Sequence, residues 1–248
     1  PLIPVNHVQA HMAVNFLNKR MLDLRLPERA PEFPSLCIIV IGGHTQIVHY
    51  KSPLEYTILG QTRDDAVGEA FDKVAKILGL PYTGGPSIAK LAKKGNPQAY
   101  ALPKSRLDFP YDFSFSGLKT AVLRLDQKEV GKDHSFPSFE LAKHLSDGQK
   151  ADIAASFQYT AIETLLDKLV KAEKGINPKS IIITGGVSAN QYLRVRAHEL
   201  FGSRLHETDP RLSTDNGAMI ASLGYQIYKN KGRVTNYESL QIEPSLQM

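Results

Sequence analysis

The sequence predicts an α/β fold in which buried strands alternate with amphipathic helices. An isoleucine run at 181–183 is too short for a helix and apolar enough for a strand buried on both faces. A long amphipathic helix predicted over 151–174 precedes it, and paired glycines with a further helical pattern follow it. The same strand-and-glycine unit occurs at 36–48, where the apolar run ends in Gly42 and Gly43. Two such units suggest two related lobes that face one cleft.

The composition is that of a globular protein and excludes several other classes. Of 248 residues, 42% are hydrophobic and 22% are charged, so the chain can bury a sizeable core. The longest apolar run, around 36–41, is too short to cross a membrane, and no signal peptide opens the chain, which predicts a cytoplasmic location. Cys37 is the single cysteine, so a thiolate zinc site or a redox pair is excluded. The net charge of +5 is compatible with RNA without indicating it.

The first predicted helix, Asn6–Met21, carries a polar wedge between apolar walls. At about 100° per residue, the wedge contains His7, His11, Asn15 and Asn18. The apolar residues on both sides indicate that the histidines point into a partly buried place. Histidines at i and i+4 have the spacing with which one helix supplies two imidazoles to a metal ion. Two histidines that are hydrogen-bonded within a core are the alternative, and the pair alone leaves both interpretations open.

Residues 26–50 predict a loop that leads into a β-hairpin. Three prolines mark 26–35 as a loop, and the apolar run that follows predicts the strand. After Gly42 and Gly43 the chain continues as a second strand, over 45–50. Hairpins of this kind cradle phosphates through backbone donors in several ATP-using folds.

A helix is predicted over 62–78, with a capping box formed by Thr62 and Asp65 at its start. Gly68 interrupts this helix at a cost of about 1 kcal/mol relative to alanine, which indicates that another part of the chain packs closely there. Asp72 lies on the same face as Gly68. It either holds ribose hydroxyls or an amide, or belongs to a solvated helix face.

The middle of the chain predicts short helices and irregular segments. A turn at 82–85 precedes a short basic helix, and Ser116 is a candidate cap for a helix that follows the aromatic-rich loop 103–116. Basic and aromatic residues are interleaved here, a mix that can bind RNA but is more commonly a core segment with exposed lysines. The polar stretch 126–150 predicts a flexible insertion.

The last part of the chain predicts caps and helices around the second glycine pair. Gly175 is expected to end the long helix, and Ser188 is expected to cap the helix after the glycines. The final helix is predicted over 214–228 with Thr214 as its cap. Asp215 falls in its first turn, where a carboxylate stabilises the helix dipole without any further role.

Seven short motifs occur in order along nearly the whole chain. They are Asn-His-Val-Gln-Ala-His at 6–11, Ile-Gly-Gly-His-Thr-Gln at 41–46, Asp-Asp-Ala-Val-Gly-Glu-Ala-Phe-Asp-Lys at 64–73, Gly-Gly-Pro at 84–86, Asp-Phe-Ser-Phe-Ser-Gly-Leu-Lys-Thr at 112–120, Gly-Gly-Val-Ser-Ala-Asn at 185–190 and Thr-Asp-Asn-Gly-Ala-Met-Ile-Ala at 214–221. Together they closely resemble the bacterial tRNA N6-adenosine threonylcarbamoyltransferases, a family formerly described as O-sialoglycoprotein endopeptidases. The resemblance implies an actin/sugar-kinase/Hsp70-like fold of two α/β lobes around a nucleotide cleft.

This resemblance also implies an activity and its site. The reaction would transfer a threonylcarbamoyl group from threonylcarbamoyl-AMP to N6 of the adenosine adjacent to the anticodon, position 37, in tRNAs that read codons starting with A. A divalent metal ion, Fe²⁺ in the first place and Zn²⁺ or Mg²⁺ otherwise, would be bound by His7, His11 and Asp215. Contacts to the substrate or nucleotide would come from Ile39, Val40, Ile41, Gly42, Gly43, Asp72, Gly85 and Asn190. The implied partners are tRNA, a paralogous subunit of the same fold, a small ATPase and a separate enzyme that makes the adenylate.

The resemblance further implies a division of the chain and two departures from the family. Residues 1–125 would hold the remainder of lobe one and the start of lobe two, 126–150 the insertion, and 151–248 the nucleotide-binding lobe with the last metal ligand. Ile41 stands where the family usually has serine. The family's N-terminal segment, with a phosphate-binding loop, is absent, so lobe one is expected to be incomplete and the chain alone to be an incomplete enzyme.

Two other functions remain as alternatives. Zinc peptidases with two histidines on one helix place a glutamate after the first histidine as general base, and this position is Val8 here. A metal-dependent peptidase would therefore lack its catalytic carboxylate. The second alternative is a non-catalytic nucleotide-binding subunit, which the absent N-terminal segment keeps open.

Overall fold

The computed structural model describes residues 2–17, 30–231, 238 and 248, and it has the predicted α/β class. The strands are β1 (Ser35–Val40), β2 (Thr45–Ser52), β3 (Glu55–Gln61), β4 (Ser180–Thr184) and β5 (Leu205–Glu207). The α-helices are α1 (His7–Ala13), α2 (Val67–Ile77), α3 (Gly84–Ala92), α4 (Ser116–Glu129), α5 (Ser138–Leu141), α6 (Asp147–Ile176), α7 (Gln191–Phe201) and α8 (Gly217–Lys231). Short 3₁₀ turns follow α1, as η1 (Val14–Phe16), and precede α7, as η3 (Gly186–Ala189). Among the described residues, no helix combines the length and apolar character that crossing a bilayer requires.

The five strands form one sheet in the order β3-β2-β1-β4-β5. At its centre, β1 and β4 are parallel neighbours, whereas β2 pairs with β1 in antiparallel fashion. Because β1 and β4 run in the same direction, the turns at Gly42–Gly43 and Gly185–Gly186 lie at the same end of the sheet. The expectation that these two units form two facing lobes is therefore wrong. The sheet also takes strands from both sides of the predicted 126–150 boundary, and the domain division stays a prediction.

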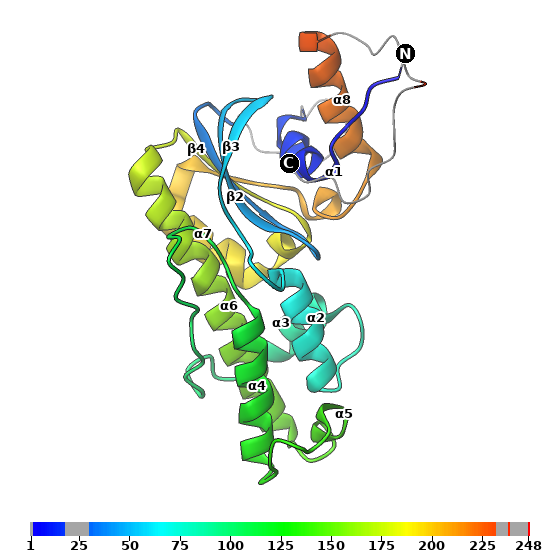
Figure 1. The fold of residues 1–248 in the computed structure, drawn as a ribbon, viewed down its shortest axis with the longest axis vertical. Helices are drawn as coiled ribbons and strands as arrows, with labels where there is room; N and C mark the ends of the chain where they lie inside the picture. The colour runs from blue at the N-terminus through cyan, green and yellow to red at the C-terminus, as the bar shows by residue number, and fades with distance from the viewer. Residues whose placement is uncertain (1, 18–29, 232–237, 239–247) are drawn as a thin grey trace.

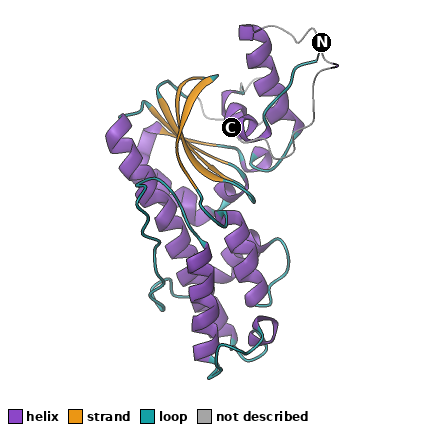
Figure 2. Cartoon of the chain, in the orientation of Figure 1, coloured by secondary structure: helices purple, strands orange, loops and turns teal. Residues whose placement is uncertain are grey.

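Helices cover both faces of the sheet (Figures 1 and 2). Alternate residues of β1 point to opposite faces: Ile38 belongs to the large core formed with α2, α3, α4, α6 and α7, whereas Ile39 belongs to a smaller cluster. In that smaller cluster, Val8 and Met12 of α1 pack on the sheet. Helix α8 packs in turn on the far side of α1, where Ala10 contributes to a third cluster. Helix α1 is therefore held between the sheet and α8.

Helix α2 begins five residues later than predicted, because its first N–H is capped from another part of the chain. The Val67 N–H donates to Thr45 Oγ1 at 2.9 Å. The predicted capping box is wrong, since the Thr62 hydroxyl donates instead to the backbone carbonyl of Asp65 at 2.8 Å. The Asp65 carboxylate pairs with Lys73.

Other helix ends also differ from the prediction. Asn190 caps α7 in place of Ser188, and the Asn216 carboxamide accepts from the Met219 N–H in place of Thr214. At the start of α4, the Asp64 carboxylate accepts from the N–H groups of Phe115 and Ser116. Helix α6 ends at Ile176 with Asn177 as its C-cap, in place of Gly175. Residues 126–150 contain the end of α4, helix α5 and the start of α6, and their flexibility stays a prediction. Residues 18–21 of the first predicted helix and 26–29 of the first loop lie outside the described residues.

Helix α4 buries a carboxyl group that has no hydrogen-bond partner. Asp126 is 0% exposed, and neither of its oxygens has a partner within the described part of the chain. Burial, and then the nearby charge of Glu129, raise the pKa of Asp126 to about 7. The folded chain therefore binds one more proton than the unfolded chain between the ordinary aspartate pKa and this value.

The contribution of Asp126 to the free energy of unfolding is accordingly expected to fall as the pH rises from about 4 to about 7 and to stay level above that. Asp126→Asn removes the buried charge, so the variant should be more stable than the original chain at pH 8 by up to about 4 kcal/mol, with little difference at pH 4. Urea unfolding across this pH range measures the effect. Asp108→Asn, at an exposed aspartate, is the matched control, and equal pH profiles for both variants would contradict the expectation.

Candidate metal centre

The two histidines of the predicted pair lie one turn apart on α1. The helix begins at His7 because the Asn6 side chain caps it, accepting the Gln9 N–H at 2.9 Å. His11 is 1% exposed, and the side chain of His7 is 52% exposed. The apolar faces of α1 are taken up by the sheet and by α8, so the wedge that carries the histidines opens toward the loop before α8. The predicted partly buried position is confirmed for His11.

Asp215 meets both rings. Its Oδ1 lies 3.2 Å from His7 Nε2 and 3.2 Å from His11 Nε2. The possible ligand atoms of the three residues all lie within 4.8 Å of one another. Asp215 lies before α8 rather than in its first turn, and because Asn216 provides the cap, the carboxylate is left to face the histidines. Metal–ligand bonds are about 2.1 Å long, so two ligands at adjacent coordination positions lie roughly 3–3.5 Å apart, as the observed contacts do.

His11 is a buried imidazole with one ring nitrogen left without a partner by the described residues. Its Nδ1 has no hydrogen-bond partner among the residues that the structure describes, and its Nε2 faces Asp215 Oδ1 at 3.2 Å. Burial lowers the pKa of His11, the Asp215 carboxylate opposes this, and the neighbouring His7 and His44 lower it further. The neutral ring is the form that binds a metal. Two imidazoles and one carboxylate suit Fe²⁺ or Zn²⁺ better than Mg²⁺, which prefers oxygen ligands. The residues therefore fit a transition-metal ion.

The glycine turn after β1 leads into His44, which lies beside His7, and one side of the turn is closely packed. A Cβ on Gly68 of α2 would lie 2.9 Å from the Ile41 carbonyl oxygen, and one on Gly185 would lie 2.5 Å from that of Val40. The close packing predicted at Gly68 is thus confirmed. On the other side, a Cβ on Gly42 or Gly43 would meet nothing within 4 Å. The turn is therefore held on the side that faces Gly68 and Gly185, and the space beside Gly42 and Gly43 is open.

The remaining predicted contact residues differ in what they present. The side chains of Ile39 and Val40 are fully buried on opposite faces of β1, so they support the site from the core. Asp72 Oδ1 accepts the Gly84 N–H at 2.7 Å, which fixes the start of α3 against α2. A Cβ on the next residue, Gly85, would meet open space.

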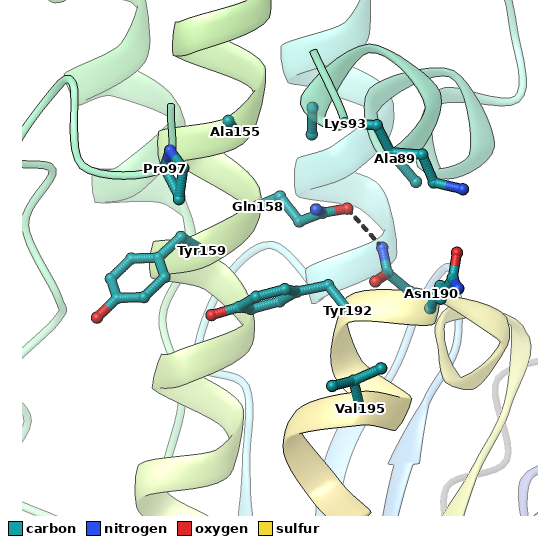
Figure 3. A pocket seen from close by; sticks show the side chains of 11 residues that line it. Ala89, Lys93, Pro97, Ala155, Gln158, Tyr159, Asn190, Tyr192 and Val195 are labelled. Carbon is teal, nitrogen blue, oxygen red and sulfur yellow. Dashed lines mark hydrogen bonds between the residues drawn. The ribbon is translucent and has the colours of Figure 1, made fainter. Parts of the chain in front are cut away.

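Asn190 lines a separate pocket of about 280 Å³ between α3, α6 and α7 (Figure 3). Its side-chain amide donates to Gln158 Oε1 at 2.8 Å, and its own Oδ1 accepts the Leu193 N–H. The other lining residues are Ala89, Ala92, Lys93, Pro97, Ala155, Tyr159, Gln191, Tyr192 and Val195. None of the three metal-ligand candidates lines this pocket. Sequence reasoning missed it because its walls come from three helices that are far apart in the sequence.

His44 is a further site residue that sequence reasoning did not single out. It follows the open glycine turn, and its backbone carbonyl accepts the Ile41 N–H at 2.9 Å, which closes the turn. Burial and the neighbouring His7 lower the pKa of His44. A neutral third imidazole therefore lies beside the cluster. Its place directly after Gly43, within one of the seven motifs, is the signal that could have identified it.

Comparisons with known proteins agree on one family. A family model described as tRNA N6-adenosine threonylcarbamoyltransferase matches residues 1–222. A relative of that description from Symbiobacterium thermophilum is 44% identical over 232 residues, which is 92% of this chain and 62% of the relative. One from Thermomicrobium roseum is 42% identical over 234 residues, 92% of this chain and 63% of the relative. The chain thus spans less than two thirds of the length of these relatives.

A solved structure, full-length HypF in its phosphate- and nucleotide-bound form, matches 94% of this chain and 44% of the HypF chain with a TM-score of 0.62. The sequence identity is 14%, so this likeness concerns the fold alone, and it confirms the expected fold class. The family model and the relatives carry the identification further. On their sequence identity and coverage, this chain belongs to the tRNA N6-adenosine threonylcarbamoyltransferase family.

Proposed function

We propose that this chain carries the metal centre and much of the substrate site of a tRNA N6-adenosine threonylcarbamoyltransferase. The observation that carries the proposal is the convergence of His7, His11 and Asp215, which come from opposite ends of the sequence. The donor would be threonylcarbamoyl-AMP and the acceptor N6 of the adenosine at position 37 in tRNAs that read codons starting with A. A tRNA substrate is consistent with the cytoplasmic location that the sequence predicts.

The proposed reaction is an acyl transfer that needs no nucleophilic side chain. The N6 amine attacks the carbamoyl carbon, the bond from that carbon to the phosphate oxygen breaks, and AMP leaves as the amine loses a proton. A divalent ion held by His7, His11 and Asp215, proposed to be Fe²⁺, would supply Lewis-acid stabilisation of oxygen charge. Because the pKa of His11 is lowered, its ring is in the neutral form that binds a metal and need not lose a proton first. No side chain or neighbouring atom fills the space beside Gly42 and Gly43, which supports a phosphate site at the backbone of this turn.

The nucleotide part of the donor would extend from the glycine turn toward α3 and Asn190. Asp72 Oδ1 is already engaged by the Gly84 N–H, so a ribose hydroxyl would take its other oxygen. The pocket beside Asn190, with the rings of Tyr159 and Tyr192 in its wall, supports a place for the adenine ring. In this placement the reacting carbonyl of threonylcarbamoyl-AMP lies near the proposed metal ligands, the phosphate at the glycine turn and the adenine ring beside Asn190. The groups follow one another in the same order in the molecule itself.

The alternatives differ in what supports them. Val8 is 3% exposed and packs in the cluster under the sheet, so nothing at this position supports a peptidase with a general base after the first histidine. A paralogous subunit and a small ATPase are proposed partners, by membership of the family. The non-catalytic subunit is an outcome of the experiment below.

The test supplies the full chain with tRNA, synthetic threonylcarbamoyl-AMP and Fe²⁺, and measures modified adenosine by mass spectrometry of digested tRNA. A parallel reaction adds, as a second polypeptide, the part of the Symbiobacterium thermophilum relative that lies outside the match. We expect modification in the combined reaction, and its loss in Asp215→Asn but not in the exposed control Asp108→Asn. Binding of the adenylate without modification in either reaction would refute the transferase and support the non-catalytic subunit.

A further inference from the structure

The helix that carries both histidines is too short to hold its own position. Helix α1 has seven residues, and a helix of that length is marginal without tertiary contacts. The last four carbonyls of any α-helix have no partner within the helix. In α1, the Val14 N–H is donated to the carbonyls of Ala10 and Met12, and the carbonyls of the last turn accept further hydrogen bonds from side chains.

Side chains from three elements supply these partners. The Thr184 hydroxyl at the end of β4 donates to the His11 carbonyl at 2.5 Å. The Ser222 hydroxyl of α8 donates to the Ala13 carbonyl at 2.7 Å. The Asn15 side-chain amide in η1 donates to the Met12 carbonyl at 3.1 Å. The end of α1 is thereby attached to the sheet on one side and to α8, which follows Asp215, on the other.

A second threonine supports the first. The Thr208 hydroxyl lies 2.8 Å from Thr184 Oγ1 and 3.1 Å from Asn15 Oδ1, and its single proton is donated to one of them at a time. Because the Thr184 proton goes to the His11 carbonyl, its oxygen is free to accept from Thr208. Asn15, Thr184 and Thr208 are all buried. These three side chains form a closed network, which we call the threonine network.

The Nδ1 atom of the His11 ring has no hydrogen bond from the described part of the chain to orient the ring. A metal-binding histidine ordinarily donates its second ring N–H to a carboxylate or carbonyl, and this bond fixes the ring. No described residue plays that part for His11, since Nδ1 has no partner and Nε2 faces the carboxylate of the other candidate ligand, Asp215, at 3.2 Å. The ring is therefore positioned by the packing around it and by its backbone. The backbone atom of His11 that a side chain fixes most closely is the carbonyl oxygen, through Thr184.

We propose that Thr184, supported by Thr208 and Asn15, is a positioning residue for the metal ligand His11. The inference rests on the metal centre of the proposed function. Thr184 also directly precedes Gly185, so one residue joins the backbone of the metal-ligand helix to the second glycine turn. The polar wedge that the sequence shows on α1 thus has two tasks, with the histidines binding the ion and Asn15 holding the end of the helix.

The test measures binding of Co²⁺ alone to the full chain, by competition with a chelator and by the visible absorption of the bound ion, whose intensity reports coordination geometry. Thr184→Val keeps the shape of the side chain but removes the hydroxyl, and we expect a 10- to 100-fold loss of affinity with an altered spectrum. Thr184→Ser restores the hydroxyl and should bind within about threefold of the original chain.

Thr164→Val is the matched control. The Thr164 hydroxyl is also buried and also donates to a helix carbonyl, that of Thr160 at 2.7 Å, but within α6 and away from the site. Thr164→Val should lower the thermal stability about as much as Thr184→Val does, and it should leave the Co²⁺ affinity within about threefold of that of the original chain. Unchanged affinity in Thr184→Val, or an equal loss in Thr164→Val, would overturn the positioning role while the metal centre stands. Absence of Co²⁺ binding by the unaltered chain would overturn the metal centre itself, and the positioning role with it.

Discussion

Replacing His11 with alanine is expected to lower the affinity of the full chain for a divalent metal ion by at least about 100-fold, because it removes a proposed ligand itself and not a residue that positions it. The thermal stabilisation that the metal gives the unaltered chain should disappear as well, since an ion stabilises a fold only as far as it binds it. Calorimetric titration with Zn²⁺ measures the affinity, and melting curves with and without Zn²⁺ measure the stabilisation.

His206→Ala is the matched control for this variant. His206 is also a buried histidine whose pKa is lowered by burial, and it contacts Ser180, the first residue of β4, whereas the cluster lies near the last. Both variants remove a buried ring, so both should lose stability in the absence of metal. The affinity for Zn²⁺ should fall in His11→Ala alone. Equal affinities in the two variants would show that the three residues do not bind the ion.

The three candidate ligands could be selected from the sequence because their signals are local or belong to a motif. Two histidines at helical spacing, in a polar wedge between apolar walls, define one face of α1 from the sequence alone. Asp215 had no such signal, since a carboxylate near a helix start has an ordinary explanation, and the family motif identified it. The structure supplies what neither could provide, the 3.2 Å contacts that join residues from the two ends of the chain.

The errors in the prediction come from long-range contacts. The strand β3 was missed although its residues alternate in exposure, and the parallel pairing of β1 with β4 has no local signature. The start of α2 was misplaced because its cap, Thr45, lies 22 residues earlier and on a strand. The threonine network was invisible for the same reason, as Asn15 and Thr208 are 193 residues apart. Hydroxyl and amide groups find partners by tertiary position, which hydrophobic periodicity does not encode.

Gly185→Ala is expected to destabilise the chain by about 3 kcal/mol or more. Gly185 has φ 96 and ψ 170, a backbone conformation that is essentially restricted to glycine. An added Cβ would also lie 2.5 Å from the Val40 carbonyl oxygen and 2.6 Å from Ile41 Cγ2. The oxygen belongs to the backbone of the neighbouring strand, so relief requires β1 and β4 to separate at the end where the glycine turns lie.

The Gly186→Ala variant shows whether the loss comes from this steric clash or from any substitution of a glycine in the turn. A Cβ on Gly186 would meet nothing within 4 Å, so this neighbouring variant should stay within about 0.5 kcal/mol of the original chain. Urea unfolding at pH 7 gives both values. If Gly185→Ala were as stable as Gly186→Ala, the contact between the two central strands could not be as close as described. The residues after β4 would then not hold the Gly42–Gly43 turn in place. The packing of β1 on β4 would no longer imply a rigid turn beside the proposed metal ligands.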